Sequence, residues 1–164
     1  MFADLFCLQV VASFSYPAVD RSGLPFAGKF GISVLGSNDG KSKLEVTIDC
    51  SRRIAGNVQV STTKEFCTAT CGEPSKLFPA PLLPQVAPPP AGAAGREEVH
   101  LHVIVDHSII ECIFNNRTAM AVAGVGGKSA DDTNLGMFGT ATDPSGVHGS
   151  LKAWQLDTAN TQYV

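Results

Sequence analysis

The sequence predicts an all-β protein, built as an antiparallel β-sandwich of two sheets. Three observations lead to this prediction. Short apolar runs that alternate or are rich in β-branched residues recur along the chain, clusters of turn-forming residues separate them, and no segment keeps a helical period for three turns. Many short strands with Gly- and Pro-rich turns favour a sandwich or a barrel over an α/β fold. We expect the sandwich.

Nine runs have the length of a strand. In chain order they are residues 8–15, 29–35, 43–49, 57–62, 99–105, 109–114, 118–122, 135–140 and 151–156. Turn formers lie between them, at residues 20–23, 37–40, 106–108, 115–117, 126–132 and 143–146. Gly, Asn, Asp and Pro in these clusters supply the backbone angles that tight turns require. The connections are therefore short, as in an antiparallel sheet.

One segment does not fit the strand pattern. Residues 74–95 are rich in Pro and Ala and include Pro88-Pro89-Pro90. They cannot form a paired central strand, because proline has no backbone N–H to donate. A chain of 164 residues is long enough for one domain with a sizeable core. We therefore expect a single sandwich over residues 1–164, with 74–95 as a loop insertion on one edge of a sheet.

The stretch after this insertion predicts a three-stranded meander. Alternate residues of 101–105 share one apolar face, residues 106–108 turn the chain, and alternate residues of 110–114 return on an apolar face. Asn115 and Asn116 can adopt the left-handed backbone conformation that a second tight turn needs. The third strand of the meander then follows.

Charge and hydropathy exclude several kinds of partner. The net charge is −3, and the Lys and Arg residues are scattered, so we expect no nucleic-acid partner. No apolar run approaches the roughly 18 residues of a membrane span, so we expect no membrane partner. Residues 1–14 contain Asp4 and no basic residue, and therefore do not resemble a signal peptide.

The cysteines do not form a recognisable metal or redox motif. They are odd in number and include no C-x-x-C pair, which excludes a zinc knuckle and a thioredoxin motif. A bridge between Cys67 and Cys71 is one alternative, and buried or idle free thiols are the favoured one. The five are Cys7, Cys50, Cys67, Cys71 and Cys112. We expect no cofactor.

Two other groups of residues have both a functional and a structural interpretation. His100, His102 and His107 with Asp106 resemble a metal cluster, because His-x-His on a strand puts both rings on one face. No fourth ligand has convincing spacing, so a solvated outer face is favoured and no metal is expected. Trp154 is either a stacking platform for a sugar ring or a core residue, and we favour the core.

The sequence Asn116-Arg117-Thr118 is an N-glycosylation sequon. It lies in a predicted hairpin turn, which would expose Asn116 to a glycosyltransferase. We expect Asn116 to be a candidate modification site if the parent protein enters the secretory pathway.

Two motifs resemble a known family. Residues 105–111 read Val-Asp-His-Ser-Ile-Ile-Glu and are followed by Arg117-Thr118, while residues 149–156 end the chain's last strand with a Leu-x-x-Trp pattern. Both are similar to the C-terminal β-sandwich of glycoside hydrolase family 32, the invertase and fructanase family. Cys50-Ser51-Arg52 loosely resembles a stretch of the plant members. The resemblance spans about residues 6–157.

The resemblance also implies where catalysis would occur. Family members resemble other retaining glycosidases in using two carboxylates, which lie on a separate β-propeller before the sandwich. The Asn-Asp-Pro-Asn-Gly and Arg-Asp-Pro motifs of that propeller are not present in this sequence. Its Asp143-Pro144 dipeptide is typical of a turn. Glu111-Cys112 spells the acid/base dipeptide but lies inside the predicted hairpin. We therefore expect no catalytic residue in this chain.

The leading hypothesis is a non-catalytic accessory sandwich whose partner is a missing catalytic β-propeller that hydrolyses sucrose or fructan. Asp106, His107, Ser108 and Glu111 form the family-signature hairpin and a candidate domain interface. An extracellular or vacuolar location would follow if the protein is like the plant members. The alternative is a freestanding, lectin-like carbohydrate-binding module, and a third hypothesis is a truncated gene product. A large exposed apolar patch would favour the first, and a polar face the second.

Overall fold

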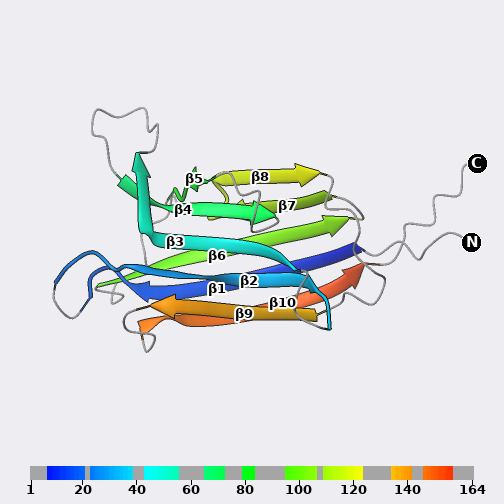
Figure 1. Ribbon diagram of the computed structural model, residues 1–164, viewed down its shortest axis with the longest axis horizontal. Helices are drawn as coiled ribbons and strands as arrows, with labels where there is room; N and C mark the ends of the chain where they lie inside the picture. Colours follow the sequence, from blue (N-terminus) through cyan, green and yellow to red (C-terminus); the bar gives the residue numbers. More distant parts are fainter. Residues whose placement is uncertain are drawn as a thin grey trace, which may run out of the picture.

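The structure of the protein is a computed structural model that describes residues 7–20, 23–38, 43–55, 65–72, 79–83, 95–106, 109–123, 134–141 and 146–156. Over these residues the chain is a sandwich of two antiparallel five-stranded sheets (Figure 1). This confirms the predicted fold class. Within the same residues, no helix is long and apolar enough to cross a membrane.

The two sheets are interleaved along the sequence. Sheet A has the order β10 (His148–Leu156), β1 (Cys7–Pro17), β6 (Arg96–Asp106), β7 (Ile109–Phe114) and β8 (Thr118–Ala123). Sheet B has the order β5 (Ala80–Pro81), β4 (Glu65–Gly72), β3 (Leu44–Ala55), β2 (Gly28–Gly36) and β9 (Asn134–Ala141). The termini of the domain thus pair with each other, because β1 lies between β10 and β6 (Figure 1).

Eight of the nine predicted runs coincide with strands of the structure, and the ninth, at residues 57–62, lies outside the described residues. Strands β4 and β5 were not predicted. The sequence of β4 is Glu-Phe-Cys-Thr-Ala-Thr-Cys-Gly, whose small side chains give little hydropathy contrast. Strand β5 is two residues of the Pro/Ala-rich segment that pair with β4 as the last strand of sheet B. An edge position suits it, because an edge strand does not need every N–H.

The predicted meander is confirmed in strands β6, β7 and β8. Its second turn uses Asn115 and Asn116 in the left-handed region, with φ of 52° and 54°. The first turn lies between Asp106 and Ile109, which pair with each other. His107 and Ser108, which separate them, lie outside the described residues.

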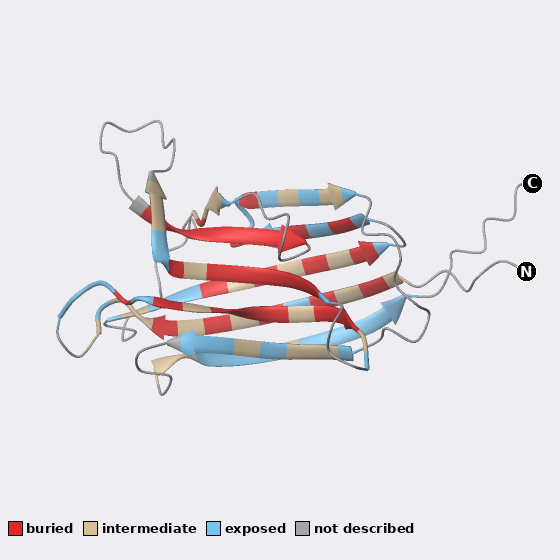
Figure 2. Cartoon of the chain, viewed as in Figure 1, coloured by how far each residue is buried: buried red, intermediate tan, exposed pale blue. Residues whose placement is uncertain are grey.

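Buried residues lie along the inner strands of both sheets (Figure 2), and those of the core cluster are apolar. At the end where β1 finishes, the rings of Phe14, Tyr16, Phe26 and Phe30 form a cluster with centroids 5.2–6.4 Å apart. Such tilted aromatic pairs add to the free energy that burial itself supplies. The largest fully buried side chains are Phe30, Phe114, Ile32, Leu44, Ile48, Leu101, Ile110, Val10, Val34, Val46, Val99 and Val103.

The cysteine predictions were wrong. Cys50 and Cys67 form a disulfide between β3 and β4, and Cys71 and Cys112 form one between the two sheets. Among the described residues, Cys7 is the cysteine outside these bridges. Cys67 and Cys71 are four residues apart on one extended strand, about 13 Å, which exceeds the roughly 7 Å limit for a bridge. Their partners come from neighbouring strands, which sequence spacing does not reveal.

The prediction for Trp154 was also wrong, since 47% of the residue is exposed. Its partner in the β1–β10 register is Gln9, which points away from the core, and directly opposed residues point to the same side of a sheet. The inward positions of β10 are instead occupied by smaller residues such as Gly149 and Leu151. The indole therefore faces outward.

Candidate functional site

The outward side of sheet A carries a group of exposed apolar side chains, which we call the apolar patch. It contains Val11 of β1, Ile109 and Ile113 of β7, and Trp154 and Leu156 of β10, all of which are exposed. These are five of the eight large apolar residues that are exposed in the described part of the chain. Single exposed apolar residues are ordinary, but their collection on one face makes this face the candidate interaction surface.

Strand register brings the patch together from distant parts of the sequence. Gln9 pairs with Trp154 on one side and with Ile104 on the other, so these three side chains lie in one row across sheet A. Val11 occupies the next row, beside Lys152 and His102. The surface is therefore apolar with polar groups distributed through it, as is usual for protein–protein interfaces.

The signature hairpin contributes its charged residues to this same face. Asp106 and Glu111 are both exposed, and the register places Glu111 opposite the half-buried Ile104. Cys112 points the other way, into the core, where it forms its disulfide. The Glu111-Cys112 dipeptide therefore spans the sheet, with its carboxylate on the open outer face. The other two predicted residues, His107 and Ser108, lie outside the described residues.

The two described histidines of the predicted cluster also lie on the outer face, where hydrogen bonds hold both rings. The Ser13 Oγ is 2.9 Å from His100 Nδ1, and the Gln9 amide donates to His102 Nε2 at 2.8 Å. Glu98 approaches His100 from the same strand, with 3.7 Å between Oε2 and Nε2. No group of three metal-ligating side chains occurs in the described ranges. These contacts support a structural role for both rings.

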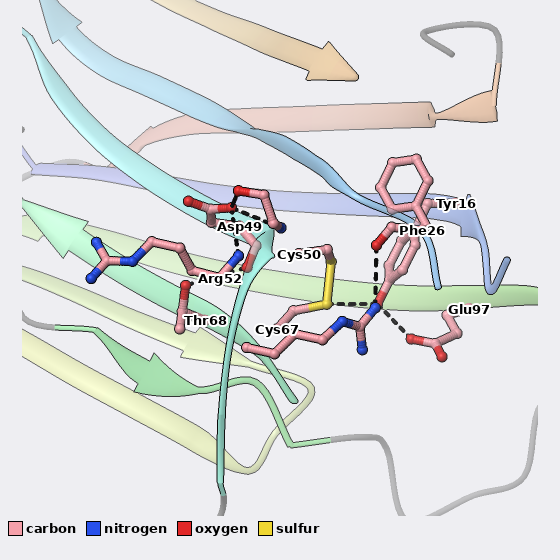
Figure 3. Close-up of a disulfide and its surroundings, with 10 residues drawn as sticks. Tyr16, Phe26, Asp49, Cys50, Arg52, Cys67, Thr68 and Glu97 are labelled. Carbon is pink, nitrogen blue, oxygen red and sulfur yellow. Dashed lines mark hydrogen bonds between the residues drawn. A yellow bond between two sulfur atoms is a disulfide. The ribbon is translucent and has the colours of Figure 1, made fainter. Parts of the chain in front are cut away.

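A polar contact within sheet A, between paired residues of β1 and β6, lies beside the Cys50–Cys67 disulfide (Figure 3). The Tyr16 hydroxyl donates to Glu97 Oε2 at 2.7 Å and lies 3.9 Å from the Cys67 sulfur. Burial raises the pKa of Tyr16 above its ordinary value, and the negative charge of Glu97 raises it further. Because the neutral hydroxyl is the form that donates, this contact stabilises the fold rather than supplying a base.

The bulge that follows Asp49 in β3 has a local cause. Pairing between β3 and β4 shifts register between Asp49 and Arg53, and one Asp49 carboxylate oxygen accepts the backbone N–H groups of Ser51 and Arg52 (Figure 3). Arg53 then donates to the backbone oxygen of Phe26 at 3.2 Å. The Cys-Ser-Arg stretch noted in the sequence is thus a bulge that turns the end of β3.

A hollow of about 200 Å³ lies where the edge strands β9 and β10 face each other. Its lining is largely apolar, and Thr140 is its one hydroxyl-bearing side chain. It is lined by Phe14, Met137, Phe138, Gly139, Thr140, Val147 and Gly149. Such a lining offers few hydrogen bonds to a sugar, whose surface is dense in hydroxyl groups.

Sequence reasoning missed the apolar patch, although a signal for it was present. A strand with one solvated face alternates apolar and polar residues, whereas Ile109-Ile110, Ile113-Phe114 and Val10-Val11 are apolar at consecutive positions. Such pairs place an apolar side chain on each face of the sheet. Asn116, the predicted glycosylation site, is exposed in the turn between β7 and β8.

Comparison with known proteins agrees with the observed fold. The family model described as "Glycosyl hydrolases family 32 C terminal" matches residues 8–155. No curated protein matches the chain. Among solved structures, the chain is similar to Aspergillus kawachii beta-fructofuranosidase complexed with glycerol, with a TM-score of 0.56 and 20% identity. That match covers 90% of this chain and 22% of the enzyme. The chain therefore belongs to the family of glycosyl hydrolase family 32 C-terminal domains.

Proposed function

We propose that the chain is the non-catalytic accessory sandwich of a β-fructofuranosidase-like glycosidase that hydrolyses sucrose or fructan. Its partner is a catalytic β-propeller, against which the apolar patch of sheet A packs. The observation that carries this proposal is the patch itself, because five exposed apolar side chains share one face of a domain of this family. Removing such a surface from water is the main driving force of association between domains.

The position of the signature hairpin also supports the outer face of sheet A as the docking surface. Asp106 and Glu111 lie among the patch residues of β7, so they would form polar contacts at the interface. Charged groups at an interface contribute more to the choice of partner and to register than to affinity. Docking would thus use the apolar side chains and the two carboxylates together, since both lie on one outer face.

The lectin-like alternative rests on the hollow between β9 and β10. Phe14 and Val147 offer apolar contacts there, but Thr140 is the one side-chain hydroxyl in the lining. A sugar site needs several polar groups placed around the ring to fix its orientation. The hollow offers one such group, whereas five exposed apolar side chains share the outer face of sheet A, which favours the accessory domain.

The first test is a hydrolysis assay of the purified chain with sucrose and inulin, run beside a binding titration with the same sugars. We expect neither turnover nor saturable binding. Turnover that survives rigorous purification would contradict the non-catalytic assignment and direct attention to Asp106 and Glu111. Binding without turnover would support the lectin-like module, and a Thr140→Val variant would then locate it in the hollow.

The docking face is tested in a chimera in which this chain replaces the corresponding sandwich of a fructofuranosidase. We expect Ile113→Ser with Trp154→Ser to lower the melting temperature and the activity of the chimera. Val19→Ser with Leu24→Ser is the matched control, because both residues are exposed and lie between β1 and β2, outside the strands of sheet A. Equal effects of the two double variants would show that the propeller does not use the patch.

A further inference from the structure

The turn between β7 and β8 combines a sequon with an accessible asparagine. Asn116-Arg117-Thr118 is the one N-x-[ST] sequence in the chain. Asn116 is exposed at the tip of the turn, whereas the adjacent Asn115 is 3% exposed. The sequence therefore offers a glycosyltransferase a single acceptor, and the fold leaves Asn116 room to carry a glycan.

The disulfides give an independent indication of the compartment. Two bridges join four of the five cysteines, and one of them connects the two sheets through the core. Disulfides form and persist in oxidising environments such as the secretory pathway, and are rare in the cytosol. The same compartment holds the machinery that reads sequons.

We propose that Asn116 carries an N-linked glycan and that it is added before the β7–β8 turn docks on β5. In the transfer, the Asn116 amide nitrogen forms a bond to the anomeric carbon of an oligosaccharide carried on a polyprenyl pyrophosphate. The bond from that carbon to the pyrophosphate oxygen breaks, the lipid pyrophosphate leaves, and the amide proton passes to a base of the transferase.

Glycosylation before folding is inferred from the environment of the Thr118 hydroxyl, the third residue of the sequon. Thr118 is 7% exposed, and its Oγ1 donates to the Pro81 carbonyl at 2.8 Å and accepts the Leu83 N–H at 3.3 Å. Asn115 secures the same segment by donating from Nδ2 to the Leu83 carbonyl at 3.0 Å. A transferase that reads the Thr118 hydroxyl therefore finds it occupied in the folded chain. Residues 81–83 precede the sequon, so folding and glycosylation compete as the chain emerges.

The experiment expresses the full chain, with a secretion signal added, in a eukaryotic host. We expect the mass of one oligosaccharide, removed by peptide N-glycosidase, and its complete loss in Asn116→Gln. Thr118→Ser keeps the hydroxyl and should retain the glycan. Asn134→Gln changes an exposed asparagine outside any sequon and should leave the mass shift intact. An unmodified secreted wild-type chain would overturn the site.

A second measurement tests the timing and the compartment. The unglycosylated chain, purified in the folded state, is incubated with microsomal membranes and the lipid-linked donor, beside the same chain reduced and unfolded. We expect modification of the unfolded chain alone, and equal modification of the folded chain would overturn the proposed timing. Thiol titration of the secreted chain should find one free cysteine, whereas five would remove the argument for an oxidising compartment.

Discussion

The two long sides of the sandwich are built differently. On the closed side, formed by β4, β5, β7 and β8, the Cys71–Cys112 disulfide and the hydrogen bonds of Asn115 and Thr118 join one sheet to the other. On the open side, β9 and β10 face each other across the hollow and are largely exposed (Figure 2).

The difference arises from side-chain size at inward positions. On the open side, Gly139 opposes Phe30 and Gly149 opposes Phe14, so the aromatic rings of the inner strands fill the space. A Cβ at Gly149 would approach the Phe14 ring to 3.1 Å. The edge strands therefore add little apolar area to the core. We therefore expect the closed side to contribute more to stability than the open side.

The largest effect is expected from the disulfide between the sheets. Cys71→Ala with Cys112→Ala should lower the free energy of unfolding by about 4 kcal/mol, because the bridge closes a loop of 41 residues. The Cys50–Cys67 bridge closes a shorter loop, of 17 residues, so Cys50→Ala with Cys67→Ala should lower the free energy of unfolding by about 3 kcal/mol. Urea denaturation of both double variants measures the difference. A reversed order would show that loop length does not set the relative cost of losing the two bridges.

The next largest effect is expected at Asn115, which connects the β7–β8 turn to β6 and to the segment after β5. Its Oδ1 accepts the His100 N–H at 2.8 Å, and its Nδ2 donates to Leu83. Asn115→Ala should cost about 2–3 kcal/mol, since it leaves buried polar groups unpaired and strains a left-handed backbone. Asn115→Gly relieves the strain and should cost less in the same urea titration. Equal costs would mean that backbone conformation contributes nothing.

A pH effect on stability is expected from Tyr16, which lies near the end of β1 in the aromatic cluster. Its pKa is raised in the folded state. Above the ordinary tyrosine pKa of about 10, the unfolded chain therefore loses this proton while the folded chain retains it, so stability falls as pH rises. Tyr16→Phe should lose about 1 kcal/mol at neutral pH and should show a weaker decline above pH 10. Parallel melting-temperature profiles for both proteins would contradict this assignment.

The smallest effect is expected on the open side. Met137 is 49% exposed, and Met137→Ala should cost less than about 1 kcal/mol. Its partner in the register, Ile32, is fully buried, and Ile32→Ala should cost about 2–5 kcal/mol. Thermal or urea unfolding of the two variants measures the difference between the edge strand β9 and its inner neighbour β2. A Met137→Ala cost close to that of Ile32→Ala would show that the open side is packed as tightly as the inner strands of sheet B.

The sequence by itself determined the fold class, eight of the strands and the meander. These depend on local chemistry: alternation sets which face of a strand is apolar, and Asn115 and Asn116 tolerate positive φ. The signature hairpin also indicated the family that the match over residues 8–155 then showed. Strand β4 escaped because its small residues give no clear alternation.

Tertiary structure alone decided the disulfide pairing, the outward position of Trp154 and the apolar patch. Each depends on which strands become neighbours and in which register. Cys71 meets Cys112 because β4 and β7 face each other across the core, and Trp154 joins Val11 on one surface because β10 pairs with β1. Separation along the chain contains no information about such contacts, since β1 and β10 come from opposite ends of the sequence.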